Sequence, residues 1–259
     1  MSGASALSVA EYRLRNMWKW KRAIIFYGLG GPFLYLASIG LGVGSLVNAN
    51  GGGLDGVPYL TFLAPALLAS AAIQGGQDEV TFPVLAGFVW QKLFFGMAAT
   101  SLTPAQIANG VLLASVVRII FTALAYWVVL WGFGAVTLAS AVVLIPCAIF
   151  AGIAFATFML WIAAKVRNDD GFFALVGRFV ITPMFLFSGT FYPLQSLPLT
   201  VQWIGWLSPL WHATEMGRAL SYGAGAQAPL FWMHALFLAL MGGAGLLLAH
   251  RQFTRRLTA

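Results

Sequence analysis

The sequence predicts an all-helical, polytopic membrane protein with six transmembrane helices, and composition is the first observation behind this prediction. Of the 259 residues, 60% are hydrophobic and only 8% are charged, and the mean hydropathy is +0.86. A soluble domain needs less apolar surface than this, because its exterior stays wet. The second observation is a series of six long apolar runs, and the third is a biased placement of Lys and Arg. We therefore expect one transmembrane domain over residues 1–259, without a separate soluble module.

Residues 1–22 precede the first apolar run and are polar and basic. Apolar side chains recur there at helical spacing, with charged ones on the other side: Leu7, Ala10, Leu14, Met17 and Trp18 against Glu11, Arg15, Lys19 and Arg22. This pattern predicts an amphipathic helix in the cytoplasmic membrane interface. The alternative is an unstructured basic lead-in. A signal peptide does not fit, because the apolar run is too long and no small-residue cleavage site follows.

The first four predicted spans follow from the apolar runs. The first covers 23–47, and an outer loop with one acid and no base covers 48–57. The second runs from Pro58 to about Gly76 and ends at Gln77-Asp78-Glu79, so we place 80–104 on the cytoplasmic side. The third and fourth cover about 106–131 and 138–164, joined by a tight turn at 132–134. Small residues on one face of the fourth, at 148, 152 and 156, favour close helix packing.

The chain is most unusual between residues 178 and 222. The fifth predicted span, 172–191, contains Pro183, which is expected to kink or break the helix. Further breaks follow at Ser188, Gly189, Pro193, Pro198 and Pro209. The segments between them, about 199–207 and 210–222, are too short to span a bilayer. We interpret 192–228 as an extracellular-side re-entrant segment, with Trp203, Trp206 and Trp211 at headgroup depth. Irregular backbone at membrane depth usually marks function.

The sixth predicted span covers 230–249, and a basic tail follows it. Five bases precede the first span, three follow the last, and Lys92, Lys165 and Arg167 fall in the even-numbered connections. The outer connections hold only Arg218. This bias predicts a multi-pass protein of the cytoplasmic membrane with both termini in the cytoplasm.

Two arginines fall inside predicted spans, Arg118 in the third and Arg178 in the fifth. An arginine at the bilayer centre costs about 2.5–3.5 kcal/mol or more on insertion scales, so each is expected to snorkel, pair or face a cavity. Glu215 and Arg218 are spaced i, i+3 and are expected to pair. The alternative is that Arg218, with His212, faces an anionic group of a transported molecule.

The sequence contains no motif for a metal site, a serine hydrolase site or a nucleotide-binding site. The three histidines are too scattered for a metal site. Ser188-Gly189 lacks the flanking glycine of a nucleophile elbow. No G-x-x-x-x-G-K-[ST] stretch is present, so the chain is expected to bind no nucleotide itself. Its basic residues lie at the termini and in loops, which disfavours nucleic-acid binding. The single cysteine, Cys147, lies in an apolar run and is expected to be buried as a small hydrophobe.

One ordered set of residues resembles a known family. It comprises Thr182-Pro183-Met184-Phe185-Leu186-Phe187-Ser188-Gly189, Phe191-Tyr192-Pro193, Leu197-Pro198, Pro209-Leu210-Trp211-His212 and Arg218. This set resembles the signature of type-2 ABC exporter permeases, most closely the nodulation-protein-J and daunorubicin-resistance branch. The segment 58–70, PYLTFLAPALLAS, resembles the second span of the same branch.

The resemblance implies a permease subunit that moves an amphiphilic cargo outward, either a lipid-linked saccharide or a hydrophobic drug. It implies two ABC ATPase subunits as partners, which would hold ATP and magnesium, together with a second permease copy or a paralogue in contact with membrane lipid. In this family the second connection carries a coupling helix that docks on the ATPase. The equivalent here is about 90–104, with candidate contacts Trp90, Leu93, Phe94 and Met97 spaced i, i+3, i+4, i+7 and Lys92 as the only charge between 80 and 104.

Three alternatives remain open. The charged loop 165–170 could contact the ATPase instead of the 90–104 segment. A secondary transporter for a hydrophobic solute would work without an ATPase, but it usually shows inverted repeats, and the sequence shows no internal repeat. A membrane enzyme would need converging titratable groups, which the predicted spans almost entirely lack.

Overall fold

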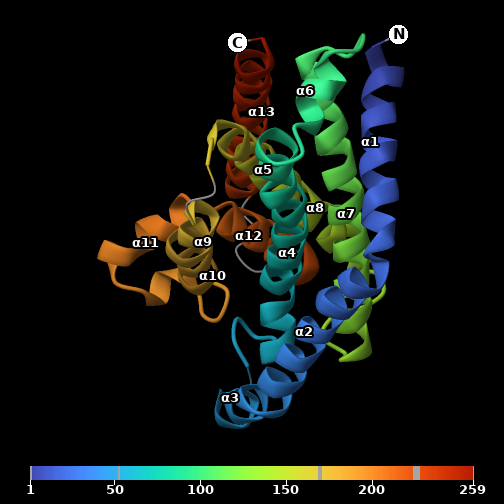
Figure 1. Cartoon of the computed structure of the whole chain (residues 1–259). Coiled ribbons are helices and arrows are strands. Elements are labelled where there is room, and N and C mark those ends of the chain that lie inside the picture. Colours follow the sequence, from blue (N-terminus) through green and yellow to red (C-terminus); the bar gives the residue numbers. More distant parts are fainter. Residues whose placement is uncertain (1, 52, 169–170, 224–227, 259) are drawn as a thin grey trace.

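The computed structural model describes residues 2–51, 53–168, 171–223 and 228–258. In these ranges the chain is helical and has no strand, apart from one isolated bridge between Leu54 and Val57. The long helices lie lengthwise beside one another, and both chain ends lie at the same end of the bundle (Figure 1). The all-helical class is therefore confirmed.

Four helical segments of the described chain are long and apolar enough to cross a membrane. They are 59–89, made of α4 (Tyr59–Val80) and α5 (Phe82–Val89); α7 (Pro104–Gly132); α8 (Ala141–Lys165); and Leu230–Leu257 of α13 (Ala228–Leu257). Shorter apolar helices, Phe33–Ala49 and Phe172–Phe187, fall where the first and fifth spans were expected. The first of these includes parts of α2 (Lys21–Leu41) and α3 (Val43–Gly51). Four of the six expected spans thus have the required length, and the other two stay predictions.

Helix α8 is the centre of the bundle, in contact with α4, α7, α12 and α13. Its small residues permit this, as predicted: Ala148 and Ala156 are buried. A Cβ added to Gly152 would lie 3.0 Å from the backbone oxygen of Ala72 on α4. Cys147 is buried on the same helix and is a free thiol.

The N-terminal segment forms the expected helix, α1 (Ser2–Lys19), and lies beside α7 (Figure 1). On the predicted apolar side, Leu7 is 60% and Trp18 is 68% exposed whereas Ala10 is buried, and the position of this side in the membrane interface stays a prediction. Smaller residues face inward: Val9 and the backbone of Ala6 would both lie within 2.7 Å of a Cβ added to Gly110 of α7. The close approach of two backbones thus decided which side of α1 is buried.

The second predicted span does not end near Gly76. Helix α4 continues to Val80, and α5 follows after a break at Thr81. The acids that suggested a loop are instead paired within the bundle. Arg13 of α1 lies 2.7 Å from Glu79, and Arg118 of α7 lies 2.9 Å from Asp78. Arg118 therefore does find carboxylate partners, and the pairs explain how charged residues fit inside these helices.

Helix α7 begins where the sequence predicted. Thr103 is its N-cap: the Thr103 side chain accepts from Gln106 N, and the Gln106 side chain accepts from Thr103 N. The following Pro104 occupies the first turn, where its missing N–H leaves no intrahelical bond unmade. After α7 the chain turns at Gly134, whose φ is +69°.

The segment with Pro183 bends without breaking. Helix α9 (Phe172–Val176) passes through a π-helical turn, Gly177–Ile181, into α10 (Thr182–Phe187). In that turn the N–H of Thr182 bonds to the carbonyl oxygen of Gly177, and the hydroxyl of Thr182 donates to the same oxygen at 3.0 Å. An extra residue in the turn accommodates a helix position that has no N–H to donate. The helix then continues to Phe187.

Candidate transport site and coupling segment

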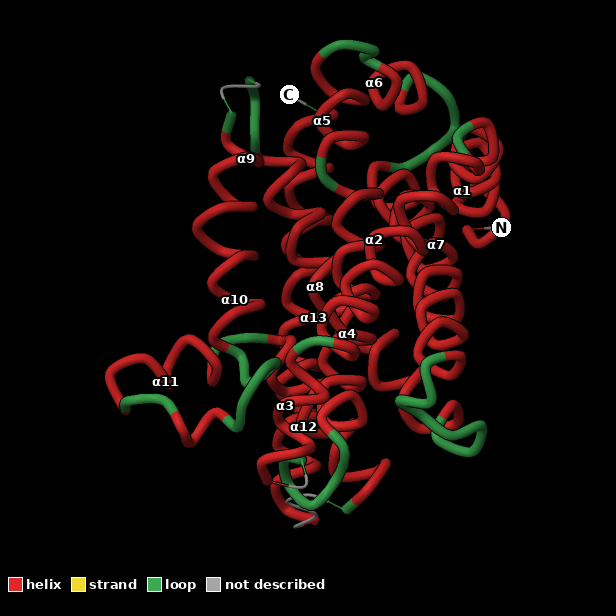
Figure 2. Tube along the Cα trace, turned by 90° about the horizontal axis from the view of Figure 1, so that it is seen from below, coloured by secondary structure: helices red, strands yellow, loops and turns green. Residues whose placement is uncertain are grey.

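The chain reverses direction directly after α10. Gly189 has a φ of +70°, and Ser188 and Thr190 on either side of it are fully buried. Glycine suits this turn because a left-handed backbone brings the Cβ of other residues too close to a carbonyl oxygen. A 3₁₀ turn, Leu194–Ser196, follows Pro193, and α11 (Leu199–Trp206) begins after Pro198. Helix α11 projects from one side of the bundle, at the left in both Figure 1 and Figure 2.

Helix α12 (Pro209–Tyr222) is the second short helix that the sequence predicted. The side chain of Ser208 caps it by accepting from Leu210 N at 3.1 Å and Trp211 N at 3.4 Å. The helix packs against α4, α8 and α13. Most of it is buried, including Trp211, which is only 9% exposed. Trp203 and Trp206 on α11 are about half exposed, and the headgroup depth of the three tryptophans stays a prediction.

Arg218 is the largest fully buried side chain among the described residues. It donates to the backbone oxygen of Gly189 at 2.8 Å and, at 3.4 Å, to that of Phe62 on α4. It also forms the expected pair with Glu215 at 3.0 Å, and its guanidinium lies 3.7 Å from the centre of the Phe62 ring. One side chain thus joins the reversed backbone, α4 and α12. Because Arg218 is enclosed, it does not face an outside anion in this conformation.

Two histidines that are far apart in sequence meet beside Trp211. The Nδ1 atoms of His212 and of His234 on α13 lie 2.7 Å apart, and His212 Nε2 lies 2.9 Å from Trp206 O. A carbonyl oxygen only accepts, so His212 Nε2–H donates to Trp206 O, and one hydrogen joins the two Nδ1 atoms. No spacing in the sequence indicates this pair, and the described residues contain no group of three or more metal-ligating side chains.

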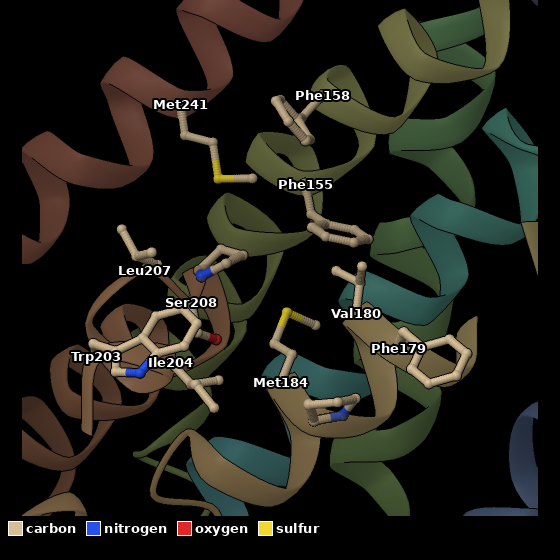
Figure 3. Close-up of a pocket in the computed structure, with 12 residues that line it drawn as sticks. Phe155, Phe158, Phe179, Val180, Met184, Trp203, Ile204, Leu207, Ser208 and Met241 are labelled. Carbon is tan, nitrogen blue, oxygen red and sulfur yellow. The ribbon is translucent and has the colours of Figure 1, made fainter. Parts of the chain in front are cut away.

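An apolar hollow of about 430 Å³ lies between α8, α13 and the α9–α12 segment (Figure 3). Met184, Phe155 and Met241 border it from three different helices, and Trp203 and Ile204 of α11 close one side. Pro183 also lies on its wall. Ser208 is the only polar side chain in the lining, and its hydroxyl already caps α12. The hollow therefore suits hydrocarbon and offers no charged group. Arg178 lies exposed in the adjacent π-helical turn.

The predicted coupling segment contains α6 (Leu93–Ala98), which follows a left-handed residue, Lys92, with a φ of +50°. Its four candidate contacts do not share one outer face. Phe94 is fully buried, with its ring centre 4.8 Å from that of Phe88 and 5.6 Å from that of Phe253. Trp90 is 56% exposed, while Leu93 and Met97 are partly buried. The prediction that Phe94 is an outward contact is therefore wrong, because the Phe94 ring packs inside the bundle. Phe95, 42% exposed, is the neighbour that the periodicity missed.

The sequence of the chain matches a known protein family over most of its length. The family model described as ABC-2 type transporter matches residues 6–222 of the chain. The chain belongs to this family. It is thus an ABC-type permease and a membrane protein. The matched range includes most of α1, all four coupling candidates and the segment up to the end of α12.

Individual ABC-2 relatives agree with the family model over most of the chain. Nodulation protein J of Rhizobium leguminosarum bv. viciae is 28% identical over 212 residues, which cover 81% of this chain and 80% of the relative. The protein of the same name from Rhizobium meliloti is 27% identical, with coverages of 83% and 81%. A third, from Bradyrhizobium diazoefficiens, is 25% identical over 90% of each chain. The resemblance stated from residues 182–218 is therefore confirmed.

Proposed function

We propose that the chain is the transmembrane permease subunit of an ATP-driven exporter that moves an amphiphilic cargo outward across the cytoplasmic membrane. The observation that carries this proposal is the ABC-2 family match over residues 6–222. A subunit of this kind has no nucleotide site of its own, in keeping with the absence of a P-loop motif from the sequence. ATP and magnesium would be held by two copies of a partner ABC ATPase, with a second permease copy or a paralogue completing the path.

The cargo class follows from the character of the candidate site. The hollow beside α10 and α11 is apolar and holds about 430 Å³, within the usual range for small-molecule sites. Phe, Met and Trp side chains on its wall suit a hydrocarbon chain better than a small ion. These features support a lipid-linked saccharide or a hydrophobic drug as the cargo.

Coupling to the ATPase is proposed at the connection between α5 and α7. Trp90 and Phe95 are its exposed aromatic side chains. Helix α6 of this connection lies at the end of the bundle that carries both termini (Figure 1). The Lys and Arg bias supports a cytoplasmic position for this end. The other candidate, 165–170, includes Asp169 and Asp170, which lie outside the described residues.

The deciding experiment combines copurification with transport. The chain, carrying an affinity tag, is isolated from its native membrane and tested for an associated ABC ATPase. A fluorescent hydrophobic dye is then added as the probe to the solution outside inside-out vesicles, and its uptake is followed with and without ATP. We expect an ATPase in the preparation and ATP-dependent uptake. Uptake driven by a proton gradient, with no ATPase present, would show a secondary transporter instead.

The proposed topology has its own test. Single cysteines replace Gln91 and Gln195, both exposed, in a Cys147→Ala background, and intact cells are treated with an impermeant maleimide. The cysteine at 195 is expected to react from outside and the one at 91 only after the cells are opened. Labelling of both positions from the same side would overturn the assignment of 192–228 to the outer face.

A further inference from the structure

The last turns of α13 divide their side chains between two faces. Phe253 is fully buried, and His250 Nε2 lies 2.7 Å from Asn109 Oδ1 on α7. Arg256 donates to the backbone oxygen of Ala164 at 2.8 Å and to that of Val166 at 2.5 Å. Its guanidinium also lies 4.2 Å from the centre of the Phe88 ring. These contacts fix the rotation of the helix against α7 and α8.

The opposite face of α13 carries Leu248, Arg251, Gln252 and Arg255, spaced i, i+3, i+4, i+7. Together with Trp161 of α8 this face borders a hollow of about 640 Å³, whose lining also includes His250 and Thr254 at the side of the helix. Arg251 and Arg255 are exposed, and neither has an ion pair with a described residue. Lys165, whose ammonium nitrogen lies 5.8 Å from the centre of the Trp161 ring, adds a third cation at the edge.

Few acids are available to neutralise this group. Helices α8 and α13 contain no Asp or Glu. Four of the seven acids form ion pairs elsewhere in the bundle. The pairs are Glu11 with Arg15, Asp78 with Arg118, Glu79 with Arg13, and Glu215 with Arg218. Asp55 interacts with Glu215, away from this end, and Asp169 and Asp170 lie outside the described residues. The hollow thus combines an aromatic wall and an apolar side with two guanidiniums that form no ion pair with any described residue.

We propose that this hollow, defined by Trp161, Leu248, Arg251, Gln252 and Arg255, binds the phosphate headgroup of an anionic phospholipid. The match is one of charge: guanidiniums bind phosphate oxygens in paired hydrogen bonds. Basic hollows between helices on the cytoplasmic side are where such headgroups bind. Leu248 and Trp161 lie toward the span, where the glycerol and acyl part of the lipid would continue. The assignment of the lipid to the cytoplasmic leaflet rests on the proposed topology, whereas the residues that form the site do not depend on it.

The test uses the purified full chain without an ATPase, so its outcome is independent of the proposed function. Native mass spectrometry measures retention of phosphatidylglycerol and of phosphatidylcholine in mixed micelles. The wild type is expected to prefer phosphatidylglycerol. Each basic residue near a membrane surface contributes roughly 1 kcal/mol, so Arg251→Gln with Arg255→Gln is expected to lower phosphatidylglycerol affinity about 30-fold. Arg251→Lys with Arg255→Lys is expected to restore most of it.

The matched control removes two exposed cations elsewhere, Lys19→Gln with Lys21→Gln, and is expected to change retention less than about threefold. An equal loss in control and test variants would overturn the proposal, because binding would then follow net charge alone. Displacement of the lipid by millimolar inorganic phosphate would overturn a lipid source in favour of a soluble anion. A test variant that retains phosphatidylglycerol as well as the wild type does would also overturn the proposal.

Discussion

Replacing Arg218 by methionine tests whether the reversed backbone depends on one buried cation. Methionine keeps an apolar stem of similar length, so the main loss is the guanidinium. That group donates to Gly189 O at 2.8 Å and to Glu215 Oε1 at 3.0 Å, and makes a longer contact to Phe62 O at 3.4 Å. A hydrogen bond with a charged partner contributes about 1.5–3 kcal/mol, so the two short bonds amount to about 3–6 kcal/mol. Loss of one partner of a buried ion pair costs about 3–5 kcal/mol, in the same range.

We therefore expect Arg218→Met to lower the free energy of unfolding by about 3–5 kcal/mol, measured by SDS titration of the purified protein in mixed micelles. The double variant with Glu215→Gln is expected to recover part of the loss, since no uncompensated carboxylate remains. Arg178→Met, at an exposed position, is the control and should change stability by about 0.5 kcal/mol or less. If Arg218→Met destabilised the protein by less than about 1 kcal/mol, Arg218 would not hold the turn, and the reasoning would be refuted.

Substitutions at four further positions test packing, partner contact, backbone conformation and helix capping. Phe94→Ala is expected to cost about 3–5 kcal/mol of stability, because its ring is fully buried, whereas Trp90→Ala should leave unfolding nearly unchanged and reduce ATPase copurification. Equal copurification by wild type and Trp90→Ala, at matched membrane levels, would place the docking surface elsewhere. Gly189→Ala should destabilise by about 1–2 kcal/mol through its positive φ, as measured by SDS titration; an unchanged unfolding midpoint would contradict this. Thr103→Ala should cost about 1 kcal/mol by the same assay, because it removes the α7 cap, and Thr103→Ser should not.

The sequence predicted features that depend on neighbouring residues. Apolar run length located the long helices, and Thr103-Pro104 located the start of α7. Proline spacing located α11 and α12 to within a residue or two of their ends. Such features follow from local backbone chemistry, which a single sequence contains.

Features that depend on distant partners were not predictable. Asp78 and Glu79 have the composition of a loop, yet they lie in a helix because Arg118 and Arg13 are beside them. The stripe with Phe94 has the spacing of an outer face, but Phe88 and Phe253 enclose its ring. The contact of His212 with His234 joins helices whose arrangement no spacing reveals. In each case the decisive atom belongs to a segment remote in sequence.

The burial of α12 has a consequence for biosynthesis. Ribosomes complete α12 before α13, yet α13 supplies part of the enclosure of α12 and the hydrogen-bond partner of His212. Until α13 is inserted, the nascent chain therefore carries an exposed Trp211 and a histidine without its partner on α13. A chain that stops before residue 228 would keep that surface permanently and present it to chaperones and membrane proteases. Insertion of α13 thus completes the enclosure of α12 during synthesis.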